Sequence, residues 1–486
     1  MKHVTEGLKP ERLWHHFEEI SSIPRASGNE SKVAEYIVRF AQQHGLRHTT
    51  DGTGNLLVVR KAGEGCESVP SVVLQSHLDM VPEKNETSNH DFEKDPIDLV
   101  VSGEWVMAKD TTLGADNGIG VAAMLAVLED ESLKTGKIEC LFTVAEETGL
   151  VGALALAPGL LTGRLLINLD TEEIGAVYIG CAGGEDSFIS LPVSKAPPSP
   201  GSEGLNVTLS GLAGGHSGID IQSGRANAIQ LVSRVISVLG ESVEFRLAGF
   251  EGGDKLNAIP REASCTVCVG PGEGSKARRL LKEAASEIAA EYQDAETGLV
   301  FDVAEVPLEG NVFDTASTEK AVNLLAVLPH GVIAMSARIE GLVETSTNLA
   351  SVREEGGTLR IGLSHRSSKQ SALDWMIGVH RAVATLSGAS IERTGGYPGW
   401  DPDPSSMLLA KVKKAVERVT EEKADVKAIH AGLECGIIGE KYPEMDMVSI
   451  GPTVTGVHSP SERVNIASVL VFWEILMACF EEIGND

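Results

Sequence analysis

The sequence lacks several features that mark other classes of protein. No apolar stretch approaches the roughly 20 uncharged residues of a membrane-spanning helix. Residues 1–20 lack the apolar core of a signal peptide and instead have the pattern of an amphipathic helix. Basic residues are few: 41 Lys and Arg stand against 69 Asp and Glu, a formal net charge of −28. We therefore expect a cytoplasmic protein that binds neither nucleic acid nor a membrane.

Cysteine is scarce as well, with seven residues scattered along 486 positions. A low, odd number of this kind favours reduced thiols over a disulfide framework. Cys265 and Cys268 have the CxxC spacing, but they lie in an alternating strand pattern in which residues three apart face opposite sides. No second pair follows, so we expect neither a zinc site nor a redox site there.

The length of the chain predicts more than one domain. In the first third, near-continuous apolar runs alternate with helical patterns, which indicates an α/β domain with a mostly parallel mixed sheet flanked by helices. After the segment 194–204, rich in Pro, Ser and Gly, alternating strands and amphipathic helices follow in two similar passes. We therefore predict a catalytic domain from residues 1–190 and 397–486, with an inserted α+β domain of two related halves at 191–396.

Five short segments place His, Asp or Glu where a site can form. Four of them follow runs of β-type apolar residues, and one puts an Asp at the start of an apolar helix. They are SHLDM (76–80), LGADNGIG (113–120), TVAEETG (143–149), INLDTEE (167–173) and GVHSP (456–460). Open α/β sheets bind ligands at the carboxyl ends of their strands, so we expect these side chains to gather there.

Individual residues in these segments suit a metal site. His77 and Asp79 are two apart on an extended segment, so Asp79 can accept a hydrogen bond from the imidazole of His77. The adjacent Glu146 and Glu147 would repel each other unless cations neutralised them. One of the pair can bind a metal while the other acts as a general base. Asp116 can bridge two cations, although a plain helix N-cap is the favoured explanation for this residue taken alone.

Asp170 ends another buried strand, and His458 lies in a loop after one. Each segment alone has an ordinary structural explanation, such as an exposed acidic loop or a structural histidine. Together they supply one carboxylate that both of two cations can share, and two further ligands for each cation. Such a mixed nitrogen and oxygen set suits zinc, with manganese or cobalt as alternatives. Two adjacent cations can activate a water and polarise a carbonyl, which indicates a hydrolase.

A series of motifs extends over nearly the whole chain in a fixed order. They are HLDMVP, TTLGADNGIG, AEETG, NLDTEE, GLAGGHSG, NAIPRE, YPGW, HAGLECG and YPEMDMVSIGP followed by HSP. On these motifs the chain resembles the M20 metallopeptidases and, within them, the aminoacyl-histidine (Xaa-His) dipeptidases. It departs from the family's TEE tripeptide at Ala145, which changes no ligand.

The resemblance implies that five side chains hold two metal ions. They are His77 and Asp170 for one metal, Glu147 and His458 for the other, and Asp116 for both. The peptide bond after Asp116 would be cis. Glu146 would act as the general base, and Asp79 would orient His77.

The inserted domain would then be a lid over the substrate. His216 in AGGHSG would stabilise the oxyanion, although a turn histidine between glycines is the plain alternative. Asn257 and Arg366 would hold polar ends of the substrate, with Arg366 on its free carboxylate, and Gly432 would line it. In smaller relatives the lid histidine comes from a partner subunit, and the doubled lid here would supply it from the same chain. Many relatives dimerise, so we expect a homodimer.

The expected activity is hydrolysis of unblocked dipeptides, including Xaa-His dipeptides such as carnosine, with two divalent metal ions and Glu146 as the base. An N-acyl amino acid deacylase is an alternative, because the same site cleaves any amide. A catalytically silent peptide-binding or metal-buffering protein is another, and the presence of Glu146 argues against it. The remaining alternative is an acidic α/β protein whose carboxylates only solvate its surface.

Overall fold

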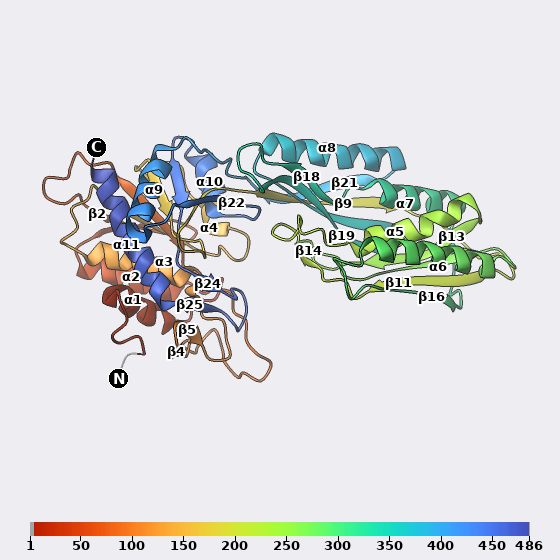
Figure 1. The fold of residues 1–486 in the computed structure, drawn as a ribbon, viewed down its shortest axis with the longest axis horizontal. Helices are drawn as coiled ribbons and strands as arrows, with labels where there is room; N and C mark the ends of the chain where they lie inside the picture. Colours follow the sequence, from red (N-terminus) through yellow and green to blue (C-terminus); the bar gives the residue numbers. More distant parts are fainter. Residues whose placement is uncertain (1–3, 486) are drawn as a thin grey trace. The chain divides into compact units, whose positions relative to one another are not determined.

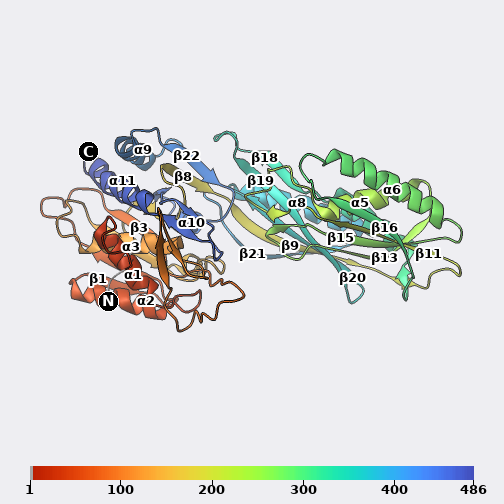
Figure 2. The ribbon, with the colours of Figure 1, turned by 60° about the horizontal axis from the view of Figure 1, so that its bottom comes forward.

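The computed structural model describes residues 4–485, which divide into two compact units (Figures 1 and 2). The first unit comprises Met1–Cys181, Trp400–Ala428 and Leu433–Asp486. The second comprises Ala182–Gly399 and the short segment Ile429–Gly432. The second unit is therefore an insertion into the first, to which four later residues of the HAGLECG region are added.

An eight-stranded mixed sheet forms the centre of the first unit, in the order β1-β2-β6-β3-β7-β23-β8-β22. These strands are β1 (Arg47–Thr50), β2 (Leu56–Arg60), β3 (Val72–His77), β6 (Ile138–Thr143), β7 (Leu165–Asn168), β8 (Ala176–Cys181), β22 (Asp425–Ile429) and β23 (Asp446–Ser449). The pairs β6–β3, β3–β7 and β7–β23 are parallel, whereas β1–β2, β2–β6 and β23–β8 are antiparallel. The predicted α/β mixed sheet is thus confirmed, with its parallel pairs at the centre. Strands β3 and β6 are buried at every position, so their polar residues are buried together with the apolar ones.

Helices pack on this sheet. They are α1 (Glu11–Ser21), α2 (Ser31–Gln43), α3 (Ala115–Glu129), α4 (Val151–Ala155), α9 (Met407–Thr420), α10 (Glu434–Lys441) and α11 (Ile466–Gly484). Helix α3 contacts both β3 and α1, and α9 contacts both α11 and β23. Since α3 is buried on nearly all sides, it is apolar around its whole circumference. Among residues 4–485, no helix combines the length and the apolar character needed to cross a bilayer.

A second, four-stranded sheet in this unit has the order β24-β25-β5-β4. Its strands are β4 (Leu99–Ser102), β5 (Trp105–Ala108), β24 (Val454–Thr455) and β25 (Arg463–Asn465). They have two to four residues each, too few for a periodic pattern, so the sequence did not predict this sheet. It brings the loop between β24 and β25, which carries His458, to the strand that precedes the Asp116 segment.

A nine-stranded antiparallel sheet forms the second unit, in the order β16-β11-β15-β13-β19-β20-β9-β21, with β18 added to β19. The strands are β9 (Gly183–Pro192), β11 (Glu203–Ser210), β13 (Phe245–Gly252), β15 (Ala263–Val269), β16 (Val300–Val306), β18 (Gly331–Met335), β19 (Val343–Glu355), β20 (Thr358–Ser367) and β21 (Ser390–Tyr397). The segment 194–204, rich in Pro, Ser and Gly, lies inside this unit. It contains β10 (Lys195–Ala196) and the start of β11.

The order of the strands confirms the two related halves. One half has β11, β13, β15 and β16 as its first to fourth strands, and the other has β9, β19, β20 and β21. In both, the spatial order is fourth, first, third, second. Each half also has one helix before its second strand and one before its fourth: α5 (Ala228–Ser237) and α6 (Gly274–Glu291), then α7 (Thr315–Val327) and α8 (Gln370–Ser387). The halves join through β13 and β19, where Gly252 pairs with Val352.

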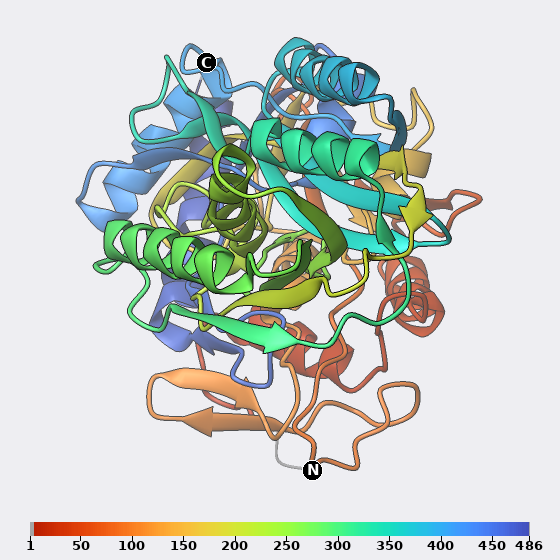
Figure 3. The same cartoon turned by 90° about the vertical axis from the view of Figure 1, so that its right-hand side faces the viewer.

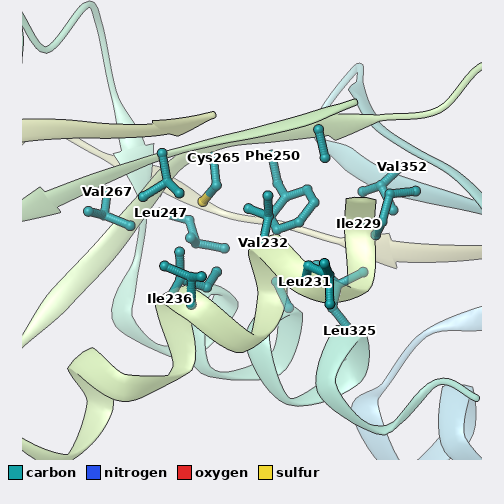
Figure 4. Close-up of a cluster of buried hydrophobic side chains, with 14 of the residues drawn as sticks. Ile229, Leu231, Val232, Ile236, Leu247, Phe250, Cys265, Val267, Leu325 and Val352 are labelled. Carbon is teal, nitrogen blue, oxygen red and sulfur yellow. The ribbon is translucent and has the colours of Figure 1, made fainter. Parts of the chain in front are cut away.

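These four helices form a layer on the sheet, seen as green to blue ribbons in Figure 3. Helix α5 contacts α6 and α7, and α7 contacts α8. The core lies between the layers: Figure 4 shows side chains of α5 facing those of β13 and β15. Cys265 is one of these core residues, and it and Cys268 are free thiols, so the CxxC spacing forms no disulfide.

Candidate metal centre

The expected ligand residues meet at the carboxyl ends of the central strands of the large sheet in the first unit. His77 is the last residue of β3, Glu146 and Glu147 follow β6, and Asp170 follows β7. Because β6, β3 and β7 are parallel neighbours, their carboxyl ends lie side by side. Asp116 comes from the first turn of α3, and His458 from the loop between β24 and β25.

Asp116 lies between the two imidazoles. Its Oδ1 atom is 3.0 Å from Nε2 of His77, and its Oδ2 atom is 3.3 Å from Nε2 of His458. On one side, Nε2 of His77 is 3.4 Å from Oδ1 of Asp170. On the other, Nε2 of His458 is 3.1 Å from Oε2 of Glu147. The arrangement offers two neighbouring donor sets that share one carboxylate.

Three overlapping groups of side chains each bring donor atoms within 4.8 Å of one another. They are His77, Asp116 and Asp170; Asp116, Glu147 and His458; and His77, Glu146 and Glu147. The structure therefore brings all five predicted ligands together and places Glu146 beside them.

The donor set fits divalent cations. Oε1 of Glu147 is buried and has no hydrogen-bond partner among the described residues. The side chains of Glu147 and Asp170 are only 8% and 7% exposed, and buried carboxylates are costly unless they are paired or bind a metal. Two imidazoles with several carboxylates form a mixed nitrogen and oxygen set suited to transition metals.

In the protein without metal, the imidazoles take the positive charge of the cluster. Hydrogen bonds to Asp116 and Glu147 raise the pKa of His458 to about 11. Burial disfavours the charged form of His77, but the neighbouring carboxylates outweigh it and raise the pKa well above its usual value. Burial also raises the pKa of Glu146 far above the ordinary glutamate range. Metal ions must displace protons from such ligands, so metal binding depends on pH.

Asp79 supports several of these groups at once. Its Oδ1 atom is 3.3 Å from Nδ1 of His77 and accepts a hydrogen bond from the backbone N–H of Glu146 at 3.0 Å. Its Oδ2 atom accepts from the N–H of Glu147 at 3.2 Å and from the hydroxyl of Ser27 at 2.8 Å. Burial alone would raise the pKa of Asp79, but these hydrogen bonds and the charge of His77 lower it to about 2. Asp79 therefore contacts three groups besides His77, the only group that we expected it to orient.

Glu462 holds the backbone that carries Asp116, a contact that the sequence did not reveal. Its carboxylate accepts hydrogen bonds from the N–H groups of Leu113, Gly114, Ala115 and Asp116 at 2.7, 2.9, 2.8 and 3.3 Å. Glu462 is 2% exposed and lies four residues after His458. Its spacing from His458 was the only available signal. One loop therefore supplies a candidate ligand and fixes the position of another.

Arg25 is a second buried residue that sequence patterns missed, at 2% exposure. Its guanidinium donates to the carbonyls of Leu78 and Asp79 at 3.0 and 3.1 Å, and also to the carbonyl of Gly114. Gly114 has a φ of +70°, and a Cβ there would lie 2.5 Å from Arg25, so this position requires glycine. Arg25 thus joins the end of β3 to the segment before Asp116.

The peptide bond between Asp116 and Asn117 is cis, as the resemblance implied. Asp116 itself has φ and ψ of −77° and 109°, so its backbone is not helical although it lies in the first turn of α3. The side-chain amide of Asn117 donates to the Leu169 carbonyl at 3.0 Å and to a carboxylate oxygen of Asp170. The turn therefore links Asp116 to the end of β7.

The predicted substrate-binding residues His216, Asn257, Arg366 and Gly432 all lie in the second unit. Nδ1 of His216 accepts hydrogen bonds from the N–H groups of Gly218 and Ile219 at 3.2 and 3.1 Å, so in the neutral ring the proton is on Nε2. The backbone carbonyl of Asn257 accepts a hydrogen bond from the N–H of Ser217, the residue after His216, at 2.8 Å.

Arg366 comes from the other half of this unit, in β20, and is 8% exposed. Its Nη1 donates to the Tyr397 hydroxyl at 3.0 Å, and its Nε has no partner among the described residues. A Cβ at Gly218 would lie 3.0 Å from that Nε, and one at Gly432 would lie 2.8 Å from the Tyr397 ring. The loop of His216 in one half therefore reaches Arg366 in the other.

Carboxylates and imidazoles gathered at the strand ends of an α/β sheet, around a shared aspartate, define a dinuclear metallohydrolase. The family comparison agrees: the model of "Peptidase family M20/M25/M40" matches residues 73–482. The chain belongs to this peptidase family.

Similar proteins cover nearly the whole chain. The "Cytosol non-specific dipeptidase" of Escherichia coli (strain K12) is 41% identical over 98% of this chain and 98% of its own length. The crystal structure of an aminoacylhistidine dipeptidase from Vibrio alginolyticus, 42% identical, has a TM-score of 0.92 and covers 99% of this chain and 98% of that one. An aminopeptidase from Bacillus cereus shares the fold at 16% identity, with a TM-score of 0.56 over 98% of this chain and 99% of that one.

Proposed function

We propose that the protein is a metal-dependent dipeptidase that hydrolyses unblocked dipeptides, including those with a C-terminal histidine. Its family and the names of its full-length relatives support this substrate class. The observation that carries the proposal is the clustering of His77, Asp116, Glu147, Asp170 and His458 with Glu146 beside them. A metal-buffering protein needs the ligands but has no use for a buried carboxylate next to them.

In this proposal, His77 and Asp170 hold one divalent cation, Glu147 and His458 hold the other, and Asp116 is shared. The unpartnered Oε1 of buried Glu147 supports its role as a ligand. The cations would make a water nucleophilic near neutral pH and polarise the scissile carbonyl. We propose zinc as the metal, with manganese or cobalt as alternatives, because the donors mix nitrogen and oxygen.

Glu146 would take the proton of the attacking water and deliver it to the leaving amine. A general base works best when its pKa lies near the working pH, and burial moves the pKa of Glu146 upward from that of an exposed glutamate. Asp79 holds the backbone N–H of Glu146 and the Nδ1 side of His77, so that neither group has to reorganise during the reaction.

The second unit would recognise the two polar ends of the substrate and its carbonyl. Nε2–H of His216 would donate to the oxyanion, since Nδ1 is occupied by backbone N–H groups. Arg366 would pair with the free carboxylate, and its buried, unpartnered Nε supports this role. Asn257 and Gly432 would position the remainder of the dipeptide. We also propose that the protein is cytoplasmic and forms a homodimer.

Metal removal and substrate comparison test this proposal together. The protein is treated with a chelator, its metal content is measured, and zinc, manganese or cobalt is returned separately. Hydrolysis of dipeptides, including carnosine, is then compared with hydrolysis of N-acyl amino acids. We expect chelation to abolish turnover and added metal to restore it, with dipeptides as the preferred substrates. Preferential cleavage of N-acyl amino acids would instead identify a deacylase, and metal binding without turnover a silent binding protein.

A further inference from the structure

A row of buried polar side chains crosses the four central strands of the large sheet in the first unit. We call it the polar row, and it consists of Thr143 in β6, Gln75 in β3, Asn168 in β7 and Ser449 in β23. Each of these side chains is 0% exposed. The sheet register pairs Gln75 with Asn168, and Asn168 with Ser449. The row therefore crosses the central strands within the buried interior of the sheet.

Hydrogen bonds connect the members of the polar row directly. Nε2 of Gln75 donates to the Thr143 hydroxyl at 3.2 Å, and Nδ2 of Asn168 donates to Oε1 of Gln75 at 2.6 Å. The hydroxyl of Ser449 donates to Oδ1 of Asn168. Adjacent strands are thus joined by side chains as well as by their backbones.

Glu434, in the first turn of α10, ends the row with a carboxylate that is also 0% exposed. Its Oε2 atom accepts hydrogen bonds from Nε2 of Gln75 at 2.5 Å and from the Thr143 hydroxyl at 2.6 Å. Its Oε1 atom has no partner among the described residues. A buried carboxylate that accepts hydrogen bonds only from neutral donors lowers the stability of the folded state. Stability alone therefore does not explain why a glutamate is present at this position.

The polar row lies directly beneath the candidate ligands. Gln75 precedes His77 by two residues in β3, so the two share a face of that strand, and Asn168, the last residue of β7, precedes Asp170 by two. Oδ1 of Asn168 also accepts the N–H of Asp170 at 3.2 Å. Thr143 is the last residue of β6, just before the segment that carries Glu146 and Glu147.

We propose that Glu434 is a positioning residue of the metal centre. By accepting hydrogen bonds from both Gln75 and Thr143, it fixes the ends of β3 and β6 relative to each other. Gln75 in turn accepts a hydrogen bond from Asn168, which restricts the position of the end of β7 in the same way. The spacing of His77, Asp170 and Glu147 then follows from the row, and metal affinity depends on it because ligands must be held closely in place. The inference rests on the proposed metal site but not on the choice of substrate.

The test compares Glu434→Ala with Glu434→Gln. The alanine removes both acceptor contacts, and we expect metal affinity, measured by competition with a chromogenic chelator, to fall about 10- to 100-fold. The glutamine keeps one oxygen that can accept from both Gln75 and Thr143. We expect it to restore metal affinity to within about threefold of the original protein, and kcat on a dipeptide to follow metal affinity while KM stays constant.

Glu139 provides a matched control, a buried glutamate in β6, the strand that also carries Thr143. It is 2% exposed and lies four residues before Thr143, where it accepts hydrogen bonds from the N–H groups of Thr162 and Gly163 at 2.9 and 3.0 Å. We expect Glu139→Ala to lower the melting temperature of the metal-free protein at least as much as Glu434→Ala, without a comparable change in metal affinity.

Two results would overturn the positioning role. One is a Glu434→Ala variant that binds metal as tightly as the Glu139→Ala control. The other is a Glu434→Gln variant whose metal affinity is as low as that of Glu434→Ala, which would make the charge the important property. Absence of metal binding by the unmodified protein would instead refute the proposed metal site. The two failures are therefore distinguishable.

Discussion

The carboxylate of Asp79 accepts a hydrogen bond from the backbone N–H of Glu146 at 3.0 Å, while the same Oδ1 atom lies 3.3 Å from Nδ1 of His77. The end of β3 and the segment after β6 are therefore held by one buried side chain. Residues two positions apart in the sequence share a face, which accounts for the contact with His77. The contact with Glu146 depends on parallel pairing of two strands far apart in the chain.

Replacing Asp79 with Ala should loosen both groups together. We expect metal affinity to fall about 10- to 100-fold, because the imidazole of His77 loses the carboxylate beside Nδ1 and keeps only the backbone carbonyl of residue 79, at 3.1 Å. Chelator competition on the refolded protein measures this change. Ser27→Ala removes one other donor to Asp79 and serves as the control, with an expected change of less than about threefold. Equal effects of the two substitutions would contradict the orienting role.

Glu146→Gln separates metal binding from proton transfer. The amide preserves the shape of the side chain but cannot accept a proton, so we expect kcat to fall by about 10² to 10⁴ with the metal content unchanged. Elemental analysis and steady-state kinetics measure the two quantities. The adjacent Glu147→Gln is the informative comparison, since it should lose bound metal. A fully active Glu146→Gln variant would exclude this residue as the base.

Glu462→Gln tests the support of the Asp116 segment. The amide group would turn an N–H₂ toward backbone N–H donors that now meet a carboxylate, so buried donors lose their acceptor. We expect the free energy of unfolding of the metal-free protein to fall by about 1–3 kcal/mol, and metal affinity to fall with it. Urea unfolding and chelator competition measure the two effects. Glu474→Gln, on an exposed position of α11, is the control and should change neither.

Arg366→Lys should weaken substrate binding rather than metal binding. Lysine keeps the charge but loses the planar fork that pairs with a carboxylate, so we expect kcat/KM on dipeptides to fall about 10- to 100-fold, mainly through KM. The same variant should differ little from the original protein on dipeptide amides, which lack the carboxylate. An equal loss on both kinds of substrate would assign Arg366 a structural role only.

Buried histidines in the second unit predict a pH dependence of stability. His365 and His380 are both 0% exposed, their rings are 4.7 Å apart, and burial lowers the pKa of each below the usual histidine value. Below pH 6.5 the unfolded chain binds protons that the folded state cannot, so stability present above that pH is lost as the pH falls. For each histidine the slope is about 1.4 kcal/mol per pH unit.

Urea unfolding of the metal-free protein between pH 8 and pH 5 measures this loss. His365 accepts or donates hydrogen bonds with Ser187 and Thr347 at 2.7 and 3.0 Å, so His365→Gln keeps polar contacts there without a titratable group. We expect the variant to lose stability less steeply than the original protein below pH 6 and equally above pH 7.5. Parallel curves over the whole range would show that His365 is not the group responsible.

Much of the site could be predicted from the sequence because its ligands follow strong local patterns. His77, Glu146 and Asp170 lie at or shortly after the carboxyl ends of buried strands, and these ends meet wherever such strands pair in parallel. The doubled pattern of the second unit was visible for the same reason. Helices and strands of eight or more residues carry a period that a single sequence reveals.

The supporting residues were not predictable in this way. Arg25, Glu434 and Glu462 are single charged residues in segments without periodicity, and an exposed position explains each of them equally well from sequence alone. The small sheet of β4, β5, β24 and β25 was missed because its strands are too short for a pattern. Only the folded chain shows that these residues are buried.

The sequence by itself determined the chemistry of this protein, because the types of side chain at the strand ends limit which ions and reactions are feasible. It also determined the layered architecture, since burial of apolar faces follows from their spacing. The tertiary structure decided which carboxylates hold other groups in place. That role depends on distances between residues hundreds of positions apart, and such distances are set by packing rather than by any local pattern.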